Sequence, residues 1–135
     1  MTSKVVVAGV GMIPFKKPGQ SDTYPVMGAQ AVRLALADAG VGYESIEQAY
    51  ASYVFGDSTG GQRVLYDVGM TGIPVINVHN NCASGSSALY LARQAIAGGQ
   101  ADVVLAFGFE QMNPGALGDM YTDRPAPLEL FQQAC

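Results

Sequence analysis

The strongest constraint on the fold is the stretch Val75–Gly85 together with the residues that follow it. β-branched apolar residues in Ile73–Val78 predict a buried strand. Two asparagines end this strand, and asparagine favours turns and helix caps. Residues 83–96 then repeat apolar side chains at helical spacing, which predicts a helix. The sequence therefore predicts a sharp strand-to-helix turn at Asn80–Cys82.

Cys82 lies in this predicted turn. The first residues of a helix expose unpaired N–H groups and the positive end of the helix dipole, and both stabilise a thiolate, the reactive form of cysteine. Small residues at 83–87 would let a second group approach the sulfur closely. A buried, inert thiol is the commoner role of a free cysteine, and placement alone leaves both interpretations open.

Apolar runs alternate with helical patterns along most of the chain. Strands are predicted over Lys4–Val10, Glu47–Val54, Val75–Val78 and Ala101–Phe109, and helices over Val26–Ala39, Gln62–Gly69 and 83–96. This β-α-β-α-β-α-β order predicts an α/β fold: a mainly parallel sheet with right-handed crossovers and helices on both faces. Asn113–Pro127 is predicted to be a loop, and Leu128–Cys135 begins a further element.

Two glycine-rich stretches resemble nucleotide-binding loops without meeting their requirements. Gly9-Val10-Gly11 has Pro14 where the third glycine of a dinucleotide fingerprint belongs. Gly56–Arg63 lacks the lysine of a phosphate-binding loop. Both are therefore interpreted as structural turns.

Charge and composition exclude several classes of function. The net charge of -4 argues against nucleic acid or an anionic membrane as partner, because both attract basic patches. No run approaches the ~20 apolar residues of a membrane span, and the N-terminus has no signal-peptide layout. Two cysteines do not make a disulfide framework. A reducing compartment is expected, the bacterial cytoplasm or the eukaryotic peroxisome, and the protein is not expected to be secreted.

Other ionisable residues offer candidates for acid–base chemistry. Glu44 and Glu47 are expected on a solvated face, because nothing nearby in the sequence would raise the pKa of either carboxyl. His79 precedes Cys82 by three residues, and a Cys–His pair generates a thiolate. Spacing does not fix the direction of His79, so a polar strand or interface residue remains the alternative.

Several motifs, in the same order along the chain, resemble thiolases of the sterol carrier protein x type. The nucleophile motif is Asn80-Asn81-Cys82-Ala83-Ser84-Gly85-Ser86, and the others are Gly9–Met12, Tyr53–Arg63, Gly69–Pro74 and Phe107–Met112. The resemblance covers nearly the whole chain and implies a three-layer thiolase-like fold. Because thiolases are much longer, it implies part of their N-terminal domain at residues 1–112 and the truncated start of the loop region at 113–135.

The resemblance also implies roles for particular residues. Cys82 is the expected nucleophile, its backbone N–H is an expected oxyanion donor, and Asn81 and Gly85 are expected to support the oxyanion site. Gln62, Arg63 and Met112 are expected to line the active site or a subunit interface. A homodimer is expected through an edge strand made of Val75, Ile76, Asn77 and Val78. No metal or permanently bound cofactor is expected.

The implied reaction is thiolytic cleavage, or the reverse condensation, of a 3-oxoacyl-CoA with a branched or sterol-derived acyl chain. Coenzyme A is a substrate, and seven Lys and Arg residues offer little for its phosphates, so those contacts are expected outside this sequence. Two alternatives stay open: a retro-aldolase of the lipid-transfer type, and a non-catalytic thiolase-like subunit completed by another chain. The 135 residues alone are expected to be inactive and to expose a large apolar surface.

Overall fold

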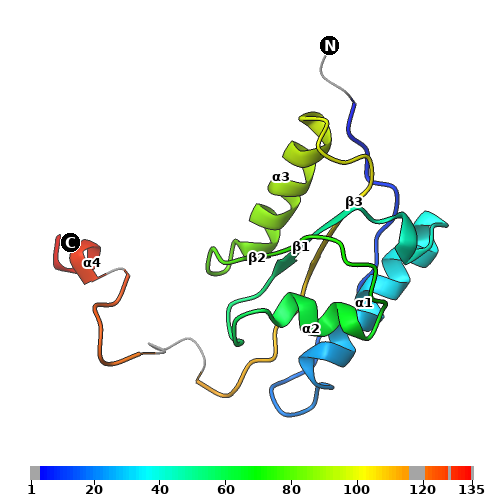
Figure 1. Cartoon of the computed structure of the whole chain (residues 1–135). Helices are drawn as coiled ribbons and strands as arrows, with labels where there is room; N and C mark the ends of the chain where they lie inside the picture. The colour runs from blue at the N-terminus through cyan, green and yellow to red at the C-terminus, as the bar shows by residue number, and fades with distance from the viewer. Residues whose placement is uncertain (1–3, 116–120, 128, 135) are drawn as a thin grey trace.

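The chain folds into three layers with a parallel sheet in the middle. The computed structural model describes residues 4–115, 121–127 and 129–134. The sheet has the order β2-β1-β3, with β1 at Gln48–Ser52, β2 at Val75–Val78 and β3 at Val104–Gly108. Both strand pairs are parallel. Helix α3 (Ser84–Ala97) covers one face, and α1 (Tyr24–Ala39) and α2 (Gly60–Tyr66) cover the other (Figure 1). The predicted fold class is confirmed.

Alternation along the strands divides the core between the two faces. Ala49 and Ala51 of β1 are fully buried in the cluster that α1 and α2 cover, whereas Tyr50 packs with Ala88 and Ala92 of α3. Successive side chains of a strand point to opposite faces, so this short central strand serves both cores. Alanine at two of its positions lets the helices approach the sheet closely.

The helices follow the sequence signals with small shifts of their ends. Helix α1 begins at Tyr24, two residues before its predicted start, and has Pro25 in its first turn. It ends at Gly40, whose φ of 68° is the left-handed conformation that glycine adopts without strain. Helix α2 begins and ends earlier than predicted. A 3₁₀ turn at Tyr43–Ser45 precedes β1, and a short helix α4 covers Glu129–Ala134.

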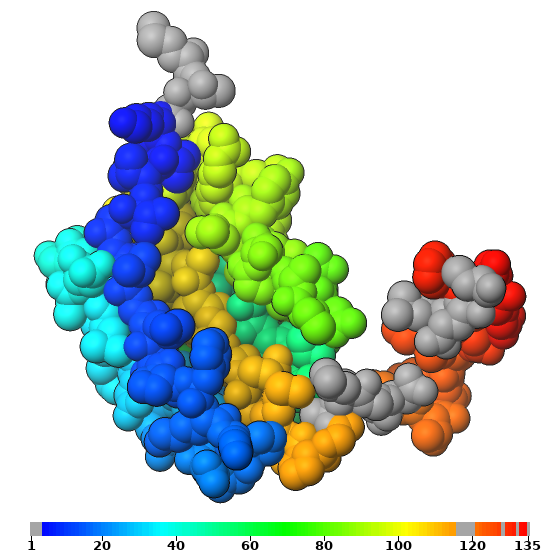
Figure 2. Space-filling model, turned by 180° about the vertical axis from the view of Figure 1, so that it is seen from behind, coloured from blue at the N-terminus to red at the C-terminus, as the bar shows by residue number. Residues whose placement is uncertain are grey.

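The prediction of a strand over Lys4–Val10 is wrong for the part of the chain that the structure describes. This segment runs in non-regular backbone along α1, beside β3, instead of joining the sheet (Figure 2). A Cβ atom on Gly9 or Gly11 would lie 2.4 Å from a backbone nitrogen of α1, so both glycines are required for this close approach. The Val10 N–H donates to the Asp38 carboxylate at 2.8 Å, a side-chain acceptor in place of a strand partner.

Apolar side chains of the same N-terminal segment remain exposed. They are Val6, Val7, Val10, Met12 and Phe15, and Phe15 is 92% exposed. A strand-like run of apolar residues predicts burial on both faces. In the structure only the side of this segment that faces α1 is covered, so the apolar run does not form a strand buried on both faces.

Candidate functional site

The turn that carries Cys82 is built from hydrogen bonds among its own residues. The N–H groups of Ala83 and Ser84 donate to the carbonyls of Asn80 and Asn81, both at 3.0 Å. The Ser84 hydroxyl donates to the Asn81 carbonyl at 2.7 Å and accepts the Asn80 N–H at 2.8 Å. Ser84 is also the first residue of α3 and is buried. A single buried hydroxyl therefore joins the end of the strand connection to the start of the helix.

Cys82 is exposed at the apex of this turn. Asn81 adopts a left-handed φ of 47°, which asparagine tolerates better than most residues, and this reverses the chain before the helix. The Cys82 thiol lies 3.8 Å from the Asn81 side-chain oxygen, to which it donates a weak hydrogen bond. The structure thus brings Asn81, Cys82 and Gly85 into one turn with an accessible sulfur. His79 is exposed immediately after β2.

The turn lies against the ends of β1 and β3. A Cβ atom on Gly85 would be 3.8 Å from the Ser52 hydroxyl, which donates to the Phe107 carbonyl at 3.1 Å. A Cβ atom on Gly108 would lie 2.3 Å from that same hydroxyl, so glycine is required there. The carboxyl ends of parallel strands are where α/β sheets place their functional groups, and Cys82 lies at that edge.

Aromatic rings hold the loop that leaves β1. Phe109 stacks between Tyr24 and Tyr53, with ring centroids 4.9 and 4.7 Å apart. The Tyr53 hydroxyl donates to the Asp57 carbonyl at 2.7 Å and accepts the Gly60 N–H at 3.1 Å. Tyr53 therefore fixes both the glycine-rich loop and the first residue of α2.

Gln62 and Arg63, both predicted near an interface or active site, have different surroundings. Gln62 accepts a hydrogen bond from the Asn77 amide at 2.8 Å and donates to the Val75 carbonyl at 3.3 Å. It therefore binds the edge strand β2. Arg63 forms an exposed ion pair with Asp67 at 3.0 Å within its own helix. An exposed pair of this kind adds little to stability.

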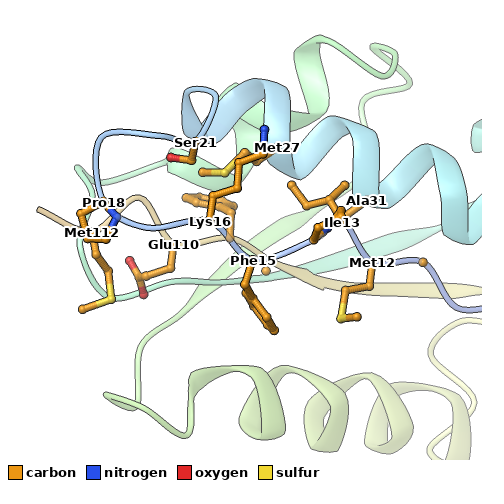
Figure 3. Close-up of a pocket in the computed structure, with 14 residues that line it drawn as sticks. Met12, Ile13, Phe15, Lys16, Pro18, Ser21, Met27, Ala31, Glu110 and Met112 are labelled. Atoms are coloured by element: carbon orange, nitrogen blue, oxygen red, sulfur yellow. The ribbon is translucent and has the colours of Figure 1, made fainter.

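A pocket of about 360 Å³ opens near the end of β3 (Figure 3). Met12, Met27 and Met112 contribute flexible apolar side chains to it, and Lys16 and Glu110 are charged residues of its lining. Met112 is half-buried in this pocket, and Cys82 is not among the lining residues.

Glu110 and Glu47 have roles that the sequence did not reveal. Glu110 accepts the N–H groups of Val54 and Phe55, and Glu47 accepts those of Asp102 and Val103. Glu47 is exposed, as predicted, but it is more than part of a solvated face: these backbone hydrogen bonds lower the pKa of its carboxyl below the usual range. The only signal in the sequence is an acidic residue next to a predicted strand end.

A comparison with protein families agrees with this geometry. The family described as "Thiolase, N-terminal domain" matches residues 5–124. The chain belongs to this family. The match includes all three strands and the turn that carries Cys82, so the resemblance noted from the motifs is confirmed.

Known proteins support the same assignment of this thiolase domain. It is 54% identical to human "Sterol carrier protein 2" over 129 residues, which are 93% of this chain and 24% of that protein. It is 36% identical to "Benzoylsuccinyl-CoA thiolase subunit BbsB" of Thauera aromatica, over 79% of this chain and 28% of that one. The sequence therefore spans about a quarter of the length of these relatives.

Solved structures share the fold. The crystal structure of 3-oxoacyl-[acyl-carrier-protein] synthase III from Aquifex aeolicus matches with a TM-score of 0.61 and 22% identity, over 71% of this chain and 32% of that one. At this identity the match shows the fold alone. Among the described residues, no group of three or more His, Cys, Asp or Glu side chains is placed to hold a metal ion. None of the helices that the structure describes is long and apolar enough to cross a membrane.

Proposed function

We propose that this domain carries the nucleophile of a thiolase that cleaves 3-oxoacyl-CoA, and that Cys82 is the nucleophile. The observation that carries the proposal is the exposed Cys82 thiol, held at the turn before α3 in a chain of the thiolase N-terminal family. An accessible sulfur beside a helix start is in the environment that activates cysteine nucleophiles.

The proposed reaction transfers an acyl group in two steps. The Cys82 thiolate attacks the 3-keto carbon, the C2–C3 bond breaks, and its electron pair stays on C2. Protonation of C2 releases acetyl-CoA or propionyl-CoA and leaves a thioester on Cys82. The thiol of free coenzyme A then attacks this thioester, which releases the shortened acyl-CoA and restores the cysteine. Coenzyme A acts as a substrate throughout, and no resident cofactor is needed.

Two backbone N–H groups are proposed to support the developing oxyanion, and Asn81 to hold the turn that presents them. The backbone N–H of Cys82 and the N–H of Gly85 lie at the start of α3, where the dipole favours negative charge. Asn81 is proposed to act through the turn, since its left-handed backbone and its side-chain oxygen fix where the sulfur lies.

The substrate class and the assembly are also proposals. The names of the relatives, a sterol carrier protein and a benzoylsuccinyl-CoA thiolase subunit, favour a branched or ring-bearing acyl chain. Strand β2 is an edge of the described sheet, and Ala49 N–H donates to the Pro74 carbonyl. In a parallel ladder alternate residues of a strand bond to a given neighbour, so this bond implies that the backbone groups of Val75 and Asn77 point away from β1. Val75–Val78 is therefore the proposed edge for a homodimer. A reducing compartment, the bacterial cytoplasm or the peroxisome, is the proposed location.

The experiment that tests the function is an intact-mass measurement after incubation with a 3-oxoacyl-CoA, made on a protein in which this domain is joined to the rest of a thiolase, because the 135 residues alone are expected to be inactive. Acylation of Cys82 should add the mass of the shortened acyl group, and free coenzyme A should remove it. Cys135→Ala should keep the adduct and Cys82→Ala should lose it. An adduct that survives in Cys82→Ala would refute Cys82 as nucleophile. Cleavage of a 3-hydroxyacyl-CoA with no adduct would favour the retro-aldolase, and no reaction with either substrate would favour a non-catalytic subunit.

A further inference from the structure

Glu110 closes the gap between two loops at the carboxyl edge of the sheet. The last ladder pair of β1 and β3 is Ser52 and Gly108, and Phe109 N–H still donates to the Ser52 carbonyl at 3.1 Å. Beyond this point the carboxylate of Glu110 takes over, accepting Val54 N–H at 3.0 Å and Phe55 N–H at 2.8 Å. Both of its oxygens are used, one for each amide. The carboxylate thus continues the hydrogen bonding between the two chain segments beyond the ends of β1 and β3.

Glu47 does the same at the opposite edge of the same two strands. It precedes β1, and its Oε2 accepts the N–H groups of Asp102 and Val103, which lead into β3. The strand pair therefore has a carboxylate clamp at each end. Each clamp is a carboxylate that accepts two backbone N–H groups, Glu110 with one oxygen for each and Glu47 with Oε2 for both, and only the Glu110 clamp lies at the edge that carries Cys82, so Glu47 serves as the control.

The loop held by Glu110 spans the edge where Cys82 lies. It begins at Ser52, which lies against Gly85 in the first turn of α3. It leads into α2, where the Gly61 N–H donates to the Asn77 side chain at 2.8 Å on the strand that leads to Cys82. Glu110 is half-buried and fixes the first two amides of this loop. The Glu47 clamp lies at the far edge of the sheet, a strand length away from Cys82.

We propose that Glu110 is a positioning residue for the Cys82 turn: by clamping the Val54 and Phe55 amides it fixes the path of the loop between Ser52, which lies beside Gly85 of α3, and Gly61, which binds Asn77 of β2. The proposal does not depend on the substrate or on the reaction proposed above. It requires that weakening the Glu110 clamp change the amide exchange and the alkylation rate at the Cys82 turn. Weakening the Glu47 clamp must leave both unchanged.

Hydrogen exchange and cysteine alkylation test this in Glu110→Gln and Glu47→Gln, both made in a Cys135→Ala background. In Glu110→Gln, exchange should rise by roughly tenfold or more at one of the two amides, Val54 or Phe55, because glutamine keeps one acceptor oxygen and presents an NH2 group to the other amide. Exchange at Ala83 and Ser84 should rise with it. The rate of Cys82 alkylation by iodoacetamide should change by roughly tenfold, under conditions where both variants are fully folded.

The matched control decides the interpretation. Glu47→Gln can keep one oxygen on both amides but loses the charge that strengthens these bonds, so it should raise exchange at Asp102 and Val103 and leave the Cys82 turn and its alkylation rate as in the parent. The proposal is overturned if Glu110→Gln leaves the turn and the alkylation rate unchanged, or if Glu47→Gln alters them equally. If Glu110→Gln fails to fold, Glu110→Asp replaces it, because aspartate keeps the charge and is one methylene too short to reach both amides. The proposal is then overturned if Glu110→Asp leaves the turn and the alkylation rate unchanged, or if Glu47→Gln alters them equally. Because neither readout uses acyl-CoA, a failed acylation experiment would leave this test intact.

Discussion

The contact between Gly28 of α1 and Val64 of α2 allows a quantitative test of how the two helices pack. Val64 is fully buried, and a Cβ atom on Gly28 would lie 2.7 and 2.9 Å from its two methyl carbons. The Cβ of Val64 itself would be 3.4 Å away, an ordinary contact. Gly28→Ala should therefore be costly alone and harmless once Val64 is shortened to alanine.

The free energies of unfolding can be estimated term by term. Val64→Ala removes two buried methyl groups, about 1.6 kcal/mol of transfer free energy, and the space left behind raises the loss to about 2–3 kcal/mol. Gly28→Ala gains about 1 kcal/mol of helix propensity and loses about 1–3 kcal/mol to overpacking. In the double variant the overpacking disappears while the helix gain remains. The double variant should then be about 1–2 kcal/mol less stable than the parent, with a favourable coupling of about 1–3 kcal/mol.

Urea unfolding followed by circular dichroism gives all four free energies of this cycle. The urea dependence should be the same for every variant, since the surface exposed on unfolding barely changes. If the two changes in the free energy of unfolding add to within about 0.5 kcal/mol, the contact with Val64 does not require glycine at position 28, and the packing argument is refuted.

Three further predictions concern single side chains. Tyr53→Phe should keep the aromatic stack and lose the hydroxyl that Gly60 N–H needs, at a cost of about 1–3 kcal/mol in urea unfolding; an unchanged midpoint would contradict this. Glu47 has a pKa below its unfolded value near 4.5, so its contribution is present above that pH and is lost as the pH falls through the folded value. Glu47→Gln should therefore be less stable than the parent at pH 7, by a margin that shrinks in acid, and a constant margin in urea titrations would count against the clamp. If the proposed homodimer forms through β2, Asn77→Pro should abolish it in sedimentation velocity, because proline removes an outward N–H of the edge strand. Asn77→Ala, which keeps that N–H, should retain the dimer, and equal behaviour of the two variants would exclude β2 as the dimer edge.

Periodicity was sufficient to predict most of the regular structure. Helices α1 and α3 present apolar residues at helical spacing, and Pro25 and Gly40 mark the two ends of α1. The β-branched run before Asn80 predicted β2 and, with it, the turn that carries Cys82. The signals for these elements lie within or next to each element in the sequence, so they can be found from a single sequence.

Contacts between distant segments could not be predicted in the same way. The apolar run at residues 4–10 has the composition of a strand, but its conformation depends on how closely Gly9 can approach α1. Glu110 is 56 residues from Val54, so an acidic residue beside a predicted strand end does not by itself show which amides it binds. The exposure of Cys82 likewise follows from how α3 meets the sheet, and local pattern left it open.

Short strands make these side-chain contacts decisive for the site. β1 and β3 have five residues each, so the ladder ends close to the loops that follow it. Beyond the ladder, a backbone N–H without a protein acceptor can bind water equally well in many loop conformations. Such groups therefore do not fix the direction of the loop. Ser84, Tyr53 and Glu110 each supply acceptors for such N–H groups at the edge that carries Cys82. We therefore expect substitutions of these few polar side chains to change the reactivity of Cys82 more than their distance from the sulfur suggests.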